Sequence, residues 1–547
     1  MNKEKKIKLI ILIALIVILG LLGFRECANK EKVEDAINNV EIEKNRVNEI
    51  TLSMVPVKTL NPLVSTDEDI FYISKLIYSS LYTFDKNMTP VGDLAKNYEF
   101  NGDTVNISLK NAKWHDGKNV DADDVEFTVD AIKAIGEKGE YYEKADKIES
   151  VSGSGTNVKI EFKDENDMSL SYLSFPILPE HKFDGTYALK KDVDDFKPVG
   201  SGRFEFSSYD ASKAMILKKN KDYYGEEAVS DIKIKVVKTS SNRTKMTETS
   251  NISVFLDKDM NRDSKITKKD IKIKNFVGNQ VEFIGFNFQN PALANKDIRH
   301  ALAYAIDIDK IIEEDYYNSA VKSDSLYFPN YLGSEKIKEE YKLNIDKAVK
   351  ILKDEEFKDT NDDGILEGKD GQKLKFKMIV NSSEPQRIEA AENIIDVLKE
   401  LNIEVELSTL DEAAYLKALK TGSFDLFIGG MSLDESLNMR DLLITDGQLN
   451  FIKYSNEEVD KHVNNLMSGD TAEENTATIN ELKKILNEEL PYYCIGYKTF
   501  GIVKAPVFNG NINANFSNPY NGIENWYCEY EKRIVEDKKL EQPKEGK

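Results

Sequence analysis

Apolar positions in the first half of the chain follow two different spacings. In two stretches they recur every three or four residues, which predicts amphipathic helices over about 67–82 and 121–135. Short apolar segments bounded by Gly, Asn and Asp turns predict strands at 104–110, 157–162 and 214–219. The first half is therefore expected to be a mixed α+β region.

The second half alternates strands with helices. Its elements are predicted in the order strand, helix, strand, helix, strand over residues 374–380, 385–401, 403–407, 411–420 and 424–428. A βαβαβ succession implies parallel strands joined by crossover helices. A mixed lobe followed by an α/β lobe predicts a two-lobed α/β architecture, and ligands of such folds usually bind in the cleft between the lobes.

The N-terminus carries an export signal. Four lysines within residues 1–8 precede an uninterrupted apolar run of 16 residues at 9–24. No small-residue cleavage site follows this run, which favours an uncleaved transmembrane signal anchor over residues 1–27. Cleavage and lipidation at Cys27 are the alternatives. In each case the body is exported, and the favoured anchor would hold it at the extracytoplasmic face of the membrane.

Charge composition narrows the function of the exported part. The chain has 75 Lys and Arg against 96 Asp and Glu, a net charge of -21, which argues against nucleic acid as a partner. The charged segments 28–47 and 532–547 are predicted to be a tether or short helix and a flexible tail. The body contains two cysteines, Cys494 and Cys528, and the sequence does not decide whether they form a disulfide.

Catalytic motifs are missing from the sequence. It contains four His and three Cys in all, and no G-x-S-x-G or H-E-x-x-H arrangement. His115 lies beside Asp116, but without a second ligand at metal-binding spacing it is interpreted as a structural, hydrogen-bonded histidine. An exported hydrolase is therefore disfavoured, and the protein is not expected to be an enzyme.

One loop has the spacing of a calcium-binding loop. Oxygen donors fall at positions 1, 3, 5, 9 and 12 of residues 259–270, as in an EF-hand. The candidate ligands are Asp259, Asn261, Asp263, Thr267 and Asp270. A weaker match covers residues 359–367. A structural calcium ion is the only cofactor that the sequence suggests.

Several short motifs occur together in a fixed order. They are LNP at 60–62, PVGDLA at 90–95, WHDGK at 114–118, ADDVEFT at 122–128, ILPEH at 177–181, PVGSG at 198–202 and RHALAYAID at 299–307. In this order they resemble the family 5 extracellular solute-binding proteins, the peptide-binding components of ABC importers. The resemblance extends over about residues 48–530.

The resemblance implies a particular form of the two-lobed fold. It is the periplasmic-binding-protein-like fold of class II, in its large three-subdomain form. Lobe 1 would comprise residues 48–285, with an outer subdomain at about 80–200, and would be completed by 500–531. Lobe 2 would comprise 286–499. Two segments crossing between the lobes, near 281–288 and 497–503, would form the hinge.

The resemblance also implies where a ligand would bind. In peptide-binding relatives an Asp that follows a strand ending in Gly-Trp meets the amine of the ligand. Here Asp434 occupies that place, with Glu435 as a reserve, although Met431 replaces the Trp and no Asp-Pro follows. Further candidate contacts are Ser65, Asp67, Tyr520, Asn521 and Trp526.

Two functions follow from this resemblance. The first is a membrane-tethered receptor, expected to have a monomeric ectodomain, that binds an oligopeptide or another small solute and delivers it to the permease subunits of an ABC importer. The second is a peptide-sensing regulatory protein on the same fold, without transport. Two features motivate the second function. The N-terminal anchor is unusual, and the segment after Gly429 and Gly430 departs from the pattern of peptide-binding relatives.

Overall fold

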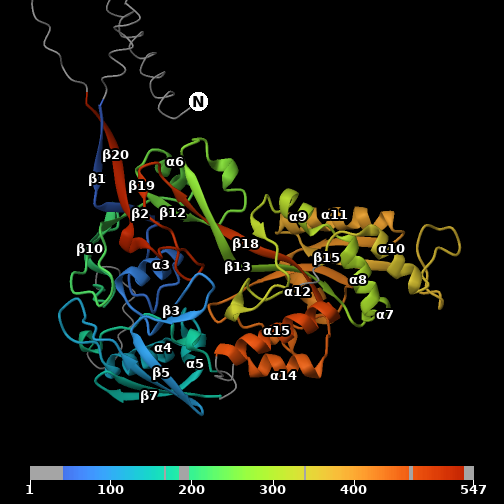
Figure 1. Ribbon diagram of the computed structural model, residues 1–547, viewed down its shortest axis with the longest axis horizontal. Coiled ribbons are helices and arrows are strands. Elements are labelled where there is room, and N and C mark those ends of the chain that lie inside the picture. The colour runs from blue at the N-terminus through green and yellow to red at the C-terminus, as the bar shows by residue number, and fades with distance from the viewer. Residues whose placement is uncertain (1–40, 165–167, 184–195, 338–340, 467–471, 535–547) are drawn as a thin grey trace, which may run out of the picture.

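A computed structural model describes residues 41–164, 168–183, 196–337, 341–466 and 472–534 (Figure 1). The predicted anchor over residues 1–27, Cys27 and most of the two charged terminal segments lie outside these residues. Within the described part of the chain, no helix combines the length and apolar character needed to cross a membrane.

The outer subdomain is a four-stranded antiparallel sheet covered by one long helix. The helix, α4 (Ala122–Ile135), lies where the sequence predicted it, and Val125, Val129 and Ile132 form its buried side. The short helix α5 (Tyr142–Asp146) follows it. The strands, in sheet order, are β5 (Ala95–Asn101), β6 (Thr104–Leu109), β8 (Asn157–Phe162) and β7 (Ile148–Ser154). The strands predicted at 104–110 and 157–162 are confirmed.

The central part of lobe 1 contains a second four-stranded sheet. Its order is β2 (Glu49–Met54), β11 (Asp231–Val236), β10 (Ala214–Lys219) and β9 (Phe204–Asp210), and β10 confirms the strand predicted at 214–219. Around this sheet lie β3 (Tyr82–Phe84), β4 (Pro90–Gly92), α6 (Asn242–Glu248) and β12 (Val254–Asp257).

Helix α3 (Glu68–Ile77) is shorter than the helix predicted over 67–82. It ends because Tyr78 adopts an extended backbone and Gly202 N–H donates to the Ile77 carbonyl at 2.8 Å. A Cβ on Gly200 would overlap the same carbonyl oxygen, so the glycines of the 198–202 motif allow this close approach. The motif is thus a packing device at the end of α3.

Two long strands cross from one lobe to the other. Strands β13 (Lys272–Phe286) and β18 (Tyr492–Lys504) pair antiparallel along most of their length, and Figure 1 shows them running together between the lobes. Their register shifts between Val277 and Val281 and again between Glu282 and Phe283. Such irregularities bend a strand pair locally. Both segments predicted to form the hinge begin within these strands.

Lobe 2 contains the predicted parallel unit. Strands β17 (Leu426–Ser432) and β16 (Glu404–Leu410) flank β15 (Lys375–Asn381), and both pair with it in parallel. The connecting helices are α11 (Pro385–Glu400) and α12 (Glu412–Thr421). On its other side β17 pairs antiparallel with β13, which joins the unit to the crossing strands. The βαβαβ prediction is confirmed.

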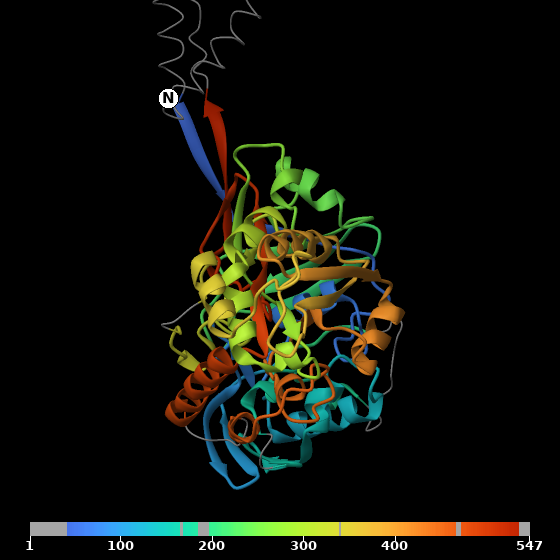
Figure 2. The same ribbon diagram turned by 90° about the vertical axis from the view of Figure 1, so that its right-hand side faces the viewer.

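The rest of lobe 2 is mostly helical. Figure 2 is a view onto lobe 2 and shows these helices packed around its sheet. The elements are α7 (Pro291–Ala294), α8 (Lys296–Ala305), α9 (Ile308–Glu314), β14 (Ala320–Val321), α10 (Ile345–Asp354), α13 (Arg440–Leu443), α14 (Glu457–Asn465) and α15 (Ala472–Glu489).

The two ends of the described chain form a ribbon that projects from lobe 1 (Figure 1). Strand β1 (Glu41–Val47) pairs antiparallel with β20 (Tyr527–Ile534), and β20 pairs in turn with β19 (Phe508–Asn509). Residues 41–47 therefore form a strand where the sequence predicted a tether or short helix, and β20 reaches into the predicted tail. The partner strands are separated by almost the whole sequence, so local patterning could not reveal this pairing.

Both body cysteines are buried free thiols. Cys494 lies on β18 and Cys528 on β20, and no disulfide joins them. Burial raises the pKa of both thiols, which keeps them protonated and unreactive. The open question of a disulfide is therefore answered by the tertiary arrangement.

Candidate functional site

A cavity of about 380 Å³ lies between the lobes. Lobe 1 lines it through the start of α3, the region of α5 and Phe516, and lobe 2 lines it through residues 432–435 after β17. Asn279 of β13 lines it too, so the crossing strands contribute to the same space. A neighbouring hollow of about 570 Å³ shares residues 432–434. Four candidates from the sequence, Ser65, Asp67, Asp434 and Glu435, line the cavity together.

The loop before α3 holds Ser65 and Asp67 in place. Asn61 is buried and organises this loop, because its carbonyl accepts from Ser65 N–H and its side-chain oxygen accepts from Leu63 N–H, both at 3.1 Å. Ser65 Oγ then accepts from Asp67 N–H at 3.1 Å. Asp67 precedes the first turn of α3 and stays half-buried, with its carboxylate at the cavity.

Asp434 begins a tight turn after β17. Its Oδ1 accepts from Ser436 N–H at 2.9 Å and from Ser436 Oγ at 2.5 Å. No hydrogen bond or ion pair within the described part of the chain uses Oδ2, and the side chain is exposed. Asp434 also borders both hollows, so a carboxylate oxygen is available there to accept from a cationic group.

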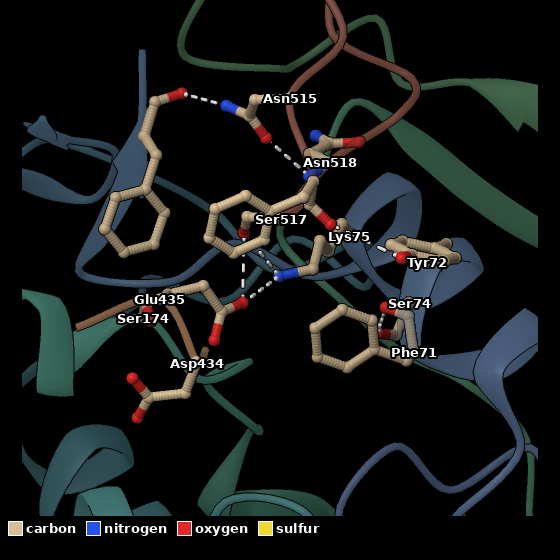
Figure 3. Close-up of polar contacts among 12 residues, drawn as sticks. Phe71, Tyr72, Ser74, Lys75, Ser174, Asp434, Glu435, Asn515, Ser517 and Asn518 are labelled. Carbon is tan, nitrogen blue, oxygen red and sulfur yellow. Dashed lines mark hydrogen bonds and ion pairs between the residues drawn. The ribbon is translucent and has the colours of Figure 1, made fainter. Parts of the chain in front are cut away.

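Glu435, the next residue, lies in the opposite environment. Its Oε2 is 2.6 Å from Lys144 Nζ, and its Oε1 is 3.5 Å from Lys75 Nζ and 3.1 Å from Ser517 Oγ. In Figure 3 its carboxylate faces Lys75 and Ser517 while that of Asp434 points away. Burial opposes its ionisation, but the two lysines prevail and lower the pKa of Glu435 to about 2.

This network changes the role expected for Glu435. The sequence predicted a reserve contact for a ligand amine, yet the carboxylate already holds two ammonium groups of the protein itself. Lys75 comes from α3, Lys144 from α5 and Ser517 from the C-terminal segment, so Glu435 connects lobe 2 to three parts of lobe 1. Both Glu435 and Lys144 are buried, and we describe this group as the Glu435 network (Glu435, Lys75, Lys144 and Ser517).

Aromatic rings form part of the cavity wall. Phe71 and Tyr141 stack with centroids 6.2 Å apart, and Tyr72 and Phe516 complete the aromatic lining. Lysines of the protein lie over two of these rings. Lys75 Nζ is 4.3 Å from the Phe71 centroid, and Lys258 Nζ is 5.3 Å from that of Tyr72. The wall thus already accommodates ammonium groups by cation–π contact.

None of the three C-terminal candidates lines this cavity. Tyr520 and Asn521 line a separate space of about 180 Å³ beside Ser517, and Tyr520 also borders a hollow of about 700 Å³ that shares Glu68, Tyr72 and Lys258 with the cavity. Trp526 is fully buried, packs edge-on against Phe508 and donates from Nε1 to the Asn511 carbonyl at 2.7 Å. Trp526 has no exposed surface for a ligand, so it stabilises the C-terminal segment instead.

Sequence reasoning missed the residues that α5 and its preceding loop supply. Glu140, Tyr141, Glu143 and Lys144 all line the cavity, and Lys258 reaches it from the segment after β12. The helix has five residues, which is too short to produce a recognisable apolar period. Its approach to the loop after β17 joins positions almost 300 residues apart. A charged pair of that separation leaves no local signal.

The predicted calcium loop does not assemble its donors. Asp259 forms an ion pair with Lys265, and Thr267 hydrogen-bonds to Glu248 at 2.8 Å. Across the residues that the structure describes, no group of three or more His, Cys, Asp or Glu side chains could hold a metal ion. The second loop, 359–367, is likewise closed by an ion pair between Asp363 and Lys373. Each loop thus has one of its candidate carboxylates paired with a lysine of the protein.

The motifs around Trp114 are structural. Asp124 is buried at the start of α4 and accepts from Trp114 Nε1 at 3.0 Å, from Asp121 N–H at 3.0 Å and from Glu180 N–H at 2.9 Å. His115 accepts from Gly200 N–H at 3.1 Å, and its other ring nitrogen lies 3.0 Å from the Gly202 carbonyl. Burial lowers the pKa of His115, so it stays neutral. The interpretation of His115 as a structural histidine is confirmed.

Known proteins are similar to this chain in sequence and in fold. The profile described as bacterial extracellular solute-binding proteins, family 5 Middle, matches residues 89–447. The chain is 27% identical to the oligopeptide-binding protein AppA of Bacillus subtilis over 80% of this chain and 83% of that protein. It is 24% identical to the nickel-binding protein NikA of Staphylococcus aureus over 74% of this chain and 79% of that protein.

Solved structures agree with the architecture. HbpA2 from Haemophilus parasuis superposes with a TM-score of 0.74 at 18% identity, over 87% of this chain and 99% of that one. The unliganded open form of the murein tripeptide binding protein MppA gives 0.75 at 15% identity, over 89% and 99%. The chain belongs to the bacterial extracellular solute-binding proteins, family 5, and the predicted two-lobed fold is confirmed.

Proposed function

We propose that this protein is a solute receptor that binds an oligopeptide-like ligand between its lobes and delivers it to the permease of an ABC importer. The observation that carries this proposal is the cavity between the lobes, with the unpaired carboxylate oxygen of Asp434 at its edge. The role is binding rather than catalysis. The oligopeptide-binding and murein-tripeptide-binding names of two relatives support a peptide as the ligand.

The lining matches the chemical groups of a peptide. The ammonium group of the ligand would meet Asp434, and Asp67 offers a second carboxylate from the opposite lobe. Aromatic rings offer apolar contact without strict side-chain selection. The polar remainder of the lining leaves room for water between ligand and protein, which tolerates variation in ligand sequence.

The crossing strands supply the motion that such a receptor needs. A ligand held by both lobes would favour their approach about the irregular pairs of β13 and β18. Recognition of the closed, ligand-bound form by the permease would couple binding to transport. We further propose that residues 1–27 anchor the monomeric body to the outer face of the membrane.

Substitution Asp434→Asn tests the amine contact. Asparagine keeps the side-chain oxygen that accepts from Ser436, so the turn is retained while the charge is removed. Isothermal titration of the full chain with free-amine oligopeptides should show a loss of affinity of about 10- to 100-fold. N-acetylated peptides should bind both proteins equally weakly.

The matched control is Asp396→Asn, an exposed carboxylate on α11 of the same lobe, which should bind as the unchanged protein does. Equal affinity of Asp434→Asn and the unchanged protein for free-amine peptides would remove Asp434 from the site.

Uptake assays separate transport from sensing, because a transport receptor requires its permease for uptake. Unaltered peptide uptake without this protein, with altered gene expression, would favour the sensing role.

A further inference from the structure

We propose that the ligand of this cleft carries at least two positive charges, so that basic peptides are bound in preference to neutral or acidic ones. This inference rests on the proposed peptide-binding function and names the class of ligand. It follows from the charges that line the cavity once the protein's own ion pairs are removed from the count.

Eight charged side chains line the cavity, six carboxylates and two lysines. Both lysines are already paired. Lys144 binds Glu435 at 2.6 Å, where Lys75 adds a second positive charge at 3.5 Å, and Lys258 binds Glu68. The four remaining carboxylates have no ion-pair partner among the residues that the structure describes; they are Asp67, Glu140, Glu143 and Asp434.

The unpaired carboxylates come from both lobes. Asp67, Glu140 and Glu143 belong to lobe 1 and Asp434 to lobe 2, so movement of the lobes toward each other would bring like charges together. Repulsion between carboxylates grows as water leaves the space between them. A ligand with one ammonium group would neutralise only part of this charge. A second cationic group in the same ligand therefore favours the approach of the lobes.

Glu140 already feels the charge of a carboxylate from the other lobe. Partial burial raises its pKa, and the charge of Glu435 is the next largest cause. Lys144 and Lys75 act in the opposite direction without cancelling these effects. No hydrogen bond to another described residue holds the Glu140 carboxylate. A cationic side chain beside Glu140 would offset both effects by attracting the ionised carboxylate.

The aromatic wall provides a second reason for a cationic ligand. Lys75 and Lys258 of the protein lie over Phe71 and Tyr72, so these rings stabilise ammonium groups where they border the cavity. The stem of a lysine or arginine in the ligand could pack on Phe516 or Tyr141 and place its charge among the carboxylates. An acidic side chain would gain neither contact.

Three pentapeptides with free N-termini test the proposal by titration of the full chain. One consists of alanine, the second carries two lysines, and the third carries two acetyl-lysines in the same places. The two-lysine peptide should bind at least about tenfold more tightly than its acetylated counterpart. The difference should shrink when the salt concentration rises from about 0.05 to about 0.5 M, because exposed charges are then screened over about 4 Å.

Variants assign this preference to named residues. Glu140→Gln and Glu143→Gln, alone and combined, should reduce the advantage of the two-lysine peptide over its acetylated counterpart to less than about threefold. Binding of the alanine peptide should weaken less than binding of the two-lysine peptide. Both side chains are exposed at their ends, so folding should survive, and circular dichroism checks it. Glu137→Gln, an exposed residue of the same connection outside the cavity, is the matched control and should retain the full advantage.

The possible outcomes separate the two proposals. Equal binding of all three peptides would overturn the charge preference and leave peptide binding intact. Binding of spermidine together with failure of every peptide would overturn the peptide function and support a polycationic ligand. Tighter binding of the acetylated peptide than of the two-lysine peptide would contradict the inference directly.

Discussion

Adjacent carboxylates in this protein have opposite surroundings. Asp434 keeps an exposed oxygen at the edge of the cleft, whereas Glu435 is buried against Lys144 and Lys75. The sequence indicated that this pair matters but ranked the two by resemblance alone. The difference arises because the turn that Ser436 closes directs the two side chains apart.

A second buried carboxylate lies on the crossing strand β13. Glu282 is 1% exposed and accepts from Arg387 Nε at 2.7 Å and Nη2 at 2.9 Å, with Lys498 Nζ at 3.1 Å. Burial alone would raise its pKa, but these cations lower it. Local patterning does not reveal this cluster, since its members lie on β13, α11 and β18.

Arg387→Leu should therefore be strongly destabilising. It leaves a buried charge without its bidentate partner, and the free energy of unfolding should fall by about 3–5 kcal/mol in urea denaturation at pH 7. The pKa of Glu282 is lower in the folded protein than in the unfolded chain. The stability that its ionised form contributes is therefore present above the unfolded pKa and is lost as the pH falls. The effect of the substitution should thus decrease below about pH 4.5.

Lys399→Leu, on an exposed position of the same helix, is the control and should change stability by less than about 0.5 kcal/mol. A cost for Arg387→Leu that stays constant down to pH 3 would show that lost packing, rather than lost charge, accounts for the destabilisation.

At the scale of elements, the start of α4 shows why a family motif can be structural. Asp124 gathers three donors from the turn at Trp114, from Asp121 and from Glu180. The helix N-terminus is thereby joined to two loops of the outer subdomain. Asp123, its neighbour, is exposed.

These two neighbours provide a matched pair of substitutions. Asp124→Ala leaves three donors without their acceptor, so the free energy of unfolding should fall by about 2–4 kcal/mol. Asp123→Ala removes only a favourable charge at the helix start and should cost less than about 1 kcal/mol. Chemical denaturation followed by circular dichroism measures both. Equal costs would contradict the central role assigned to Asp124.

Helices and strands with strong local patterns were predictable. Strands β8 and β10, helix α4 and the βαβαβ unit of lobe 2 follow from periodicity because each pattern is complete within its own segment. The end of α3 and the ribbon of β1 and β20 did not follow. The former depends on glycines more than 100 residues away, and the latter on a partner strand at the other end of the chain.

For the whole molecule, the Glu435 network is a charged contact between the lobes. It brings one carboxylate of lobe 2 to lysines on two elements of lobe 1. In a pair this well buried, the cost of removing both charges from water offsets much of their attraction. Removal of one partner is nevertheless destabilising, because it leaves the other charge buried and uncompensated. The network is therefore expected to influence how readily the lobes separate.

Lys144→Met should move the lobes apart. Small-angle scattering of the purified protein without added ligand should show a larger radius of gyration, and the melting temperature should fall. The stability that ionised Glu435 contributes to the folded protein is present above its unfolded pKa of about 4.5. It is lost as the pH falls through its folded pKa of about 2. The difference between variant and parent should therefore be constant from pH 5 to 7 and shrink in more acidic solution.

Lys163→Met provides the comparison, because Lys163 forms an exposed ion pair with Asp146 at 2.7 Å within the outer subdomain. Exposed pairs contribute little to stability, so neither the radius of gyration nor the melting temperature should change measurably. An unchanged radius for Lys144→Met would indicate that apolar contacts, not this network, hold the lobes together.

The sequence by itself determined the class of fold, the order of most elements and the position of Asp434 in a loop after a strand. These features depend on periodicities and short motifs that lie within single segments. The tertiary structure alone decided that Glu435 is paired, that Trp526 is buried, that lysines close the calcium-like loop and that α5 contributes to the cleft. Apart from the ion pair within the calcium-like loop, each of these depends on contacts between distant segments, and the energy of a charge is set by what surrounds it in space.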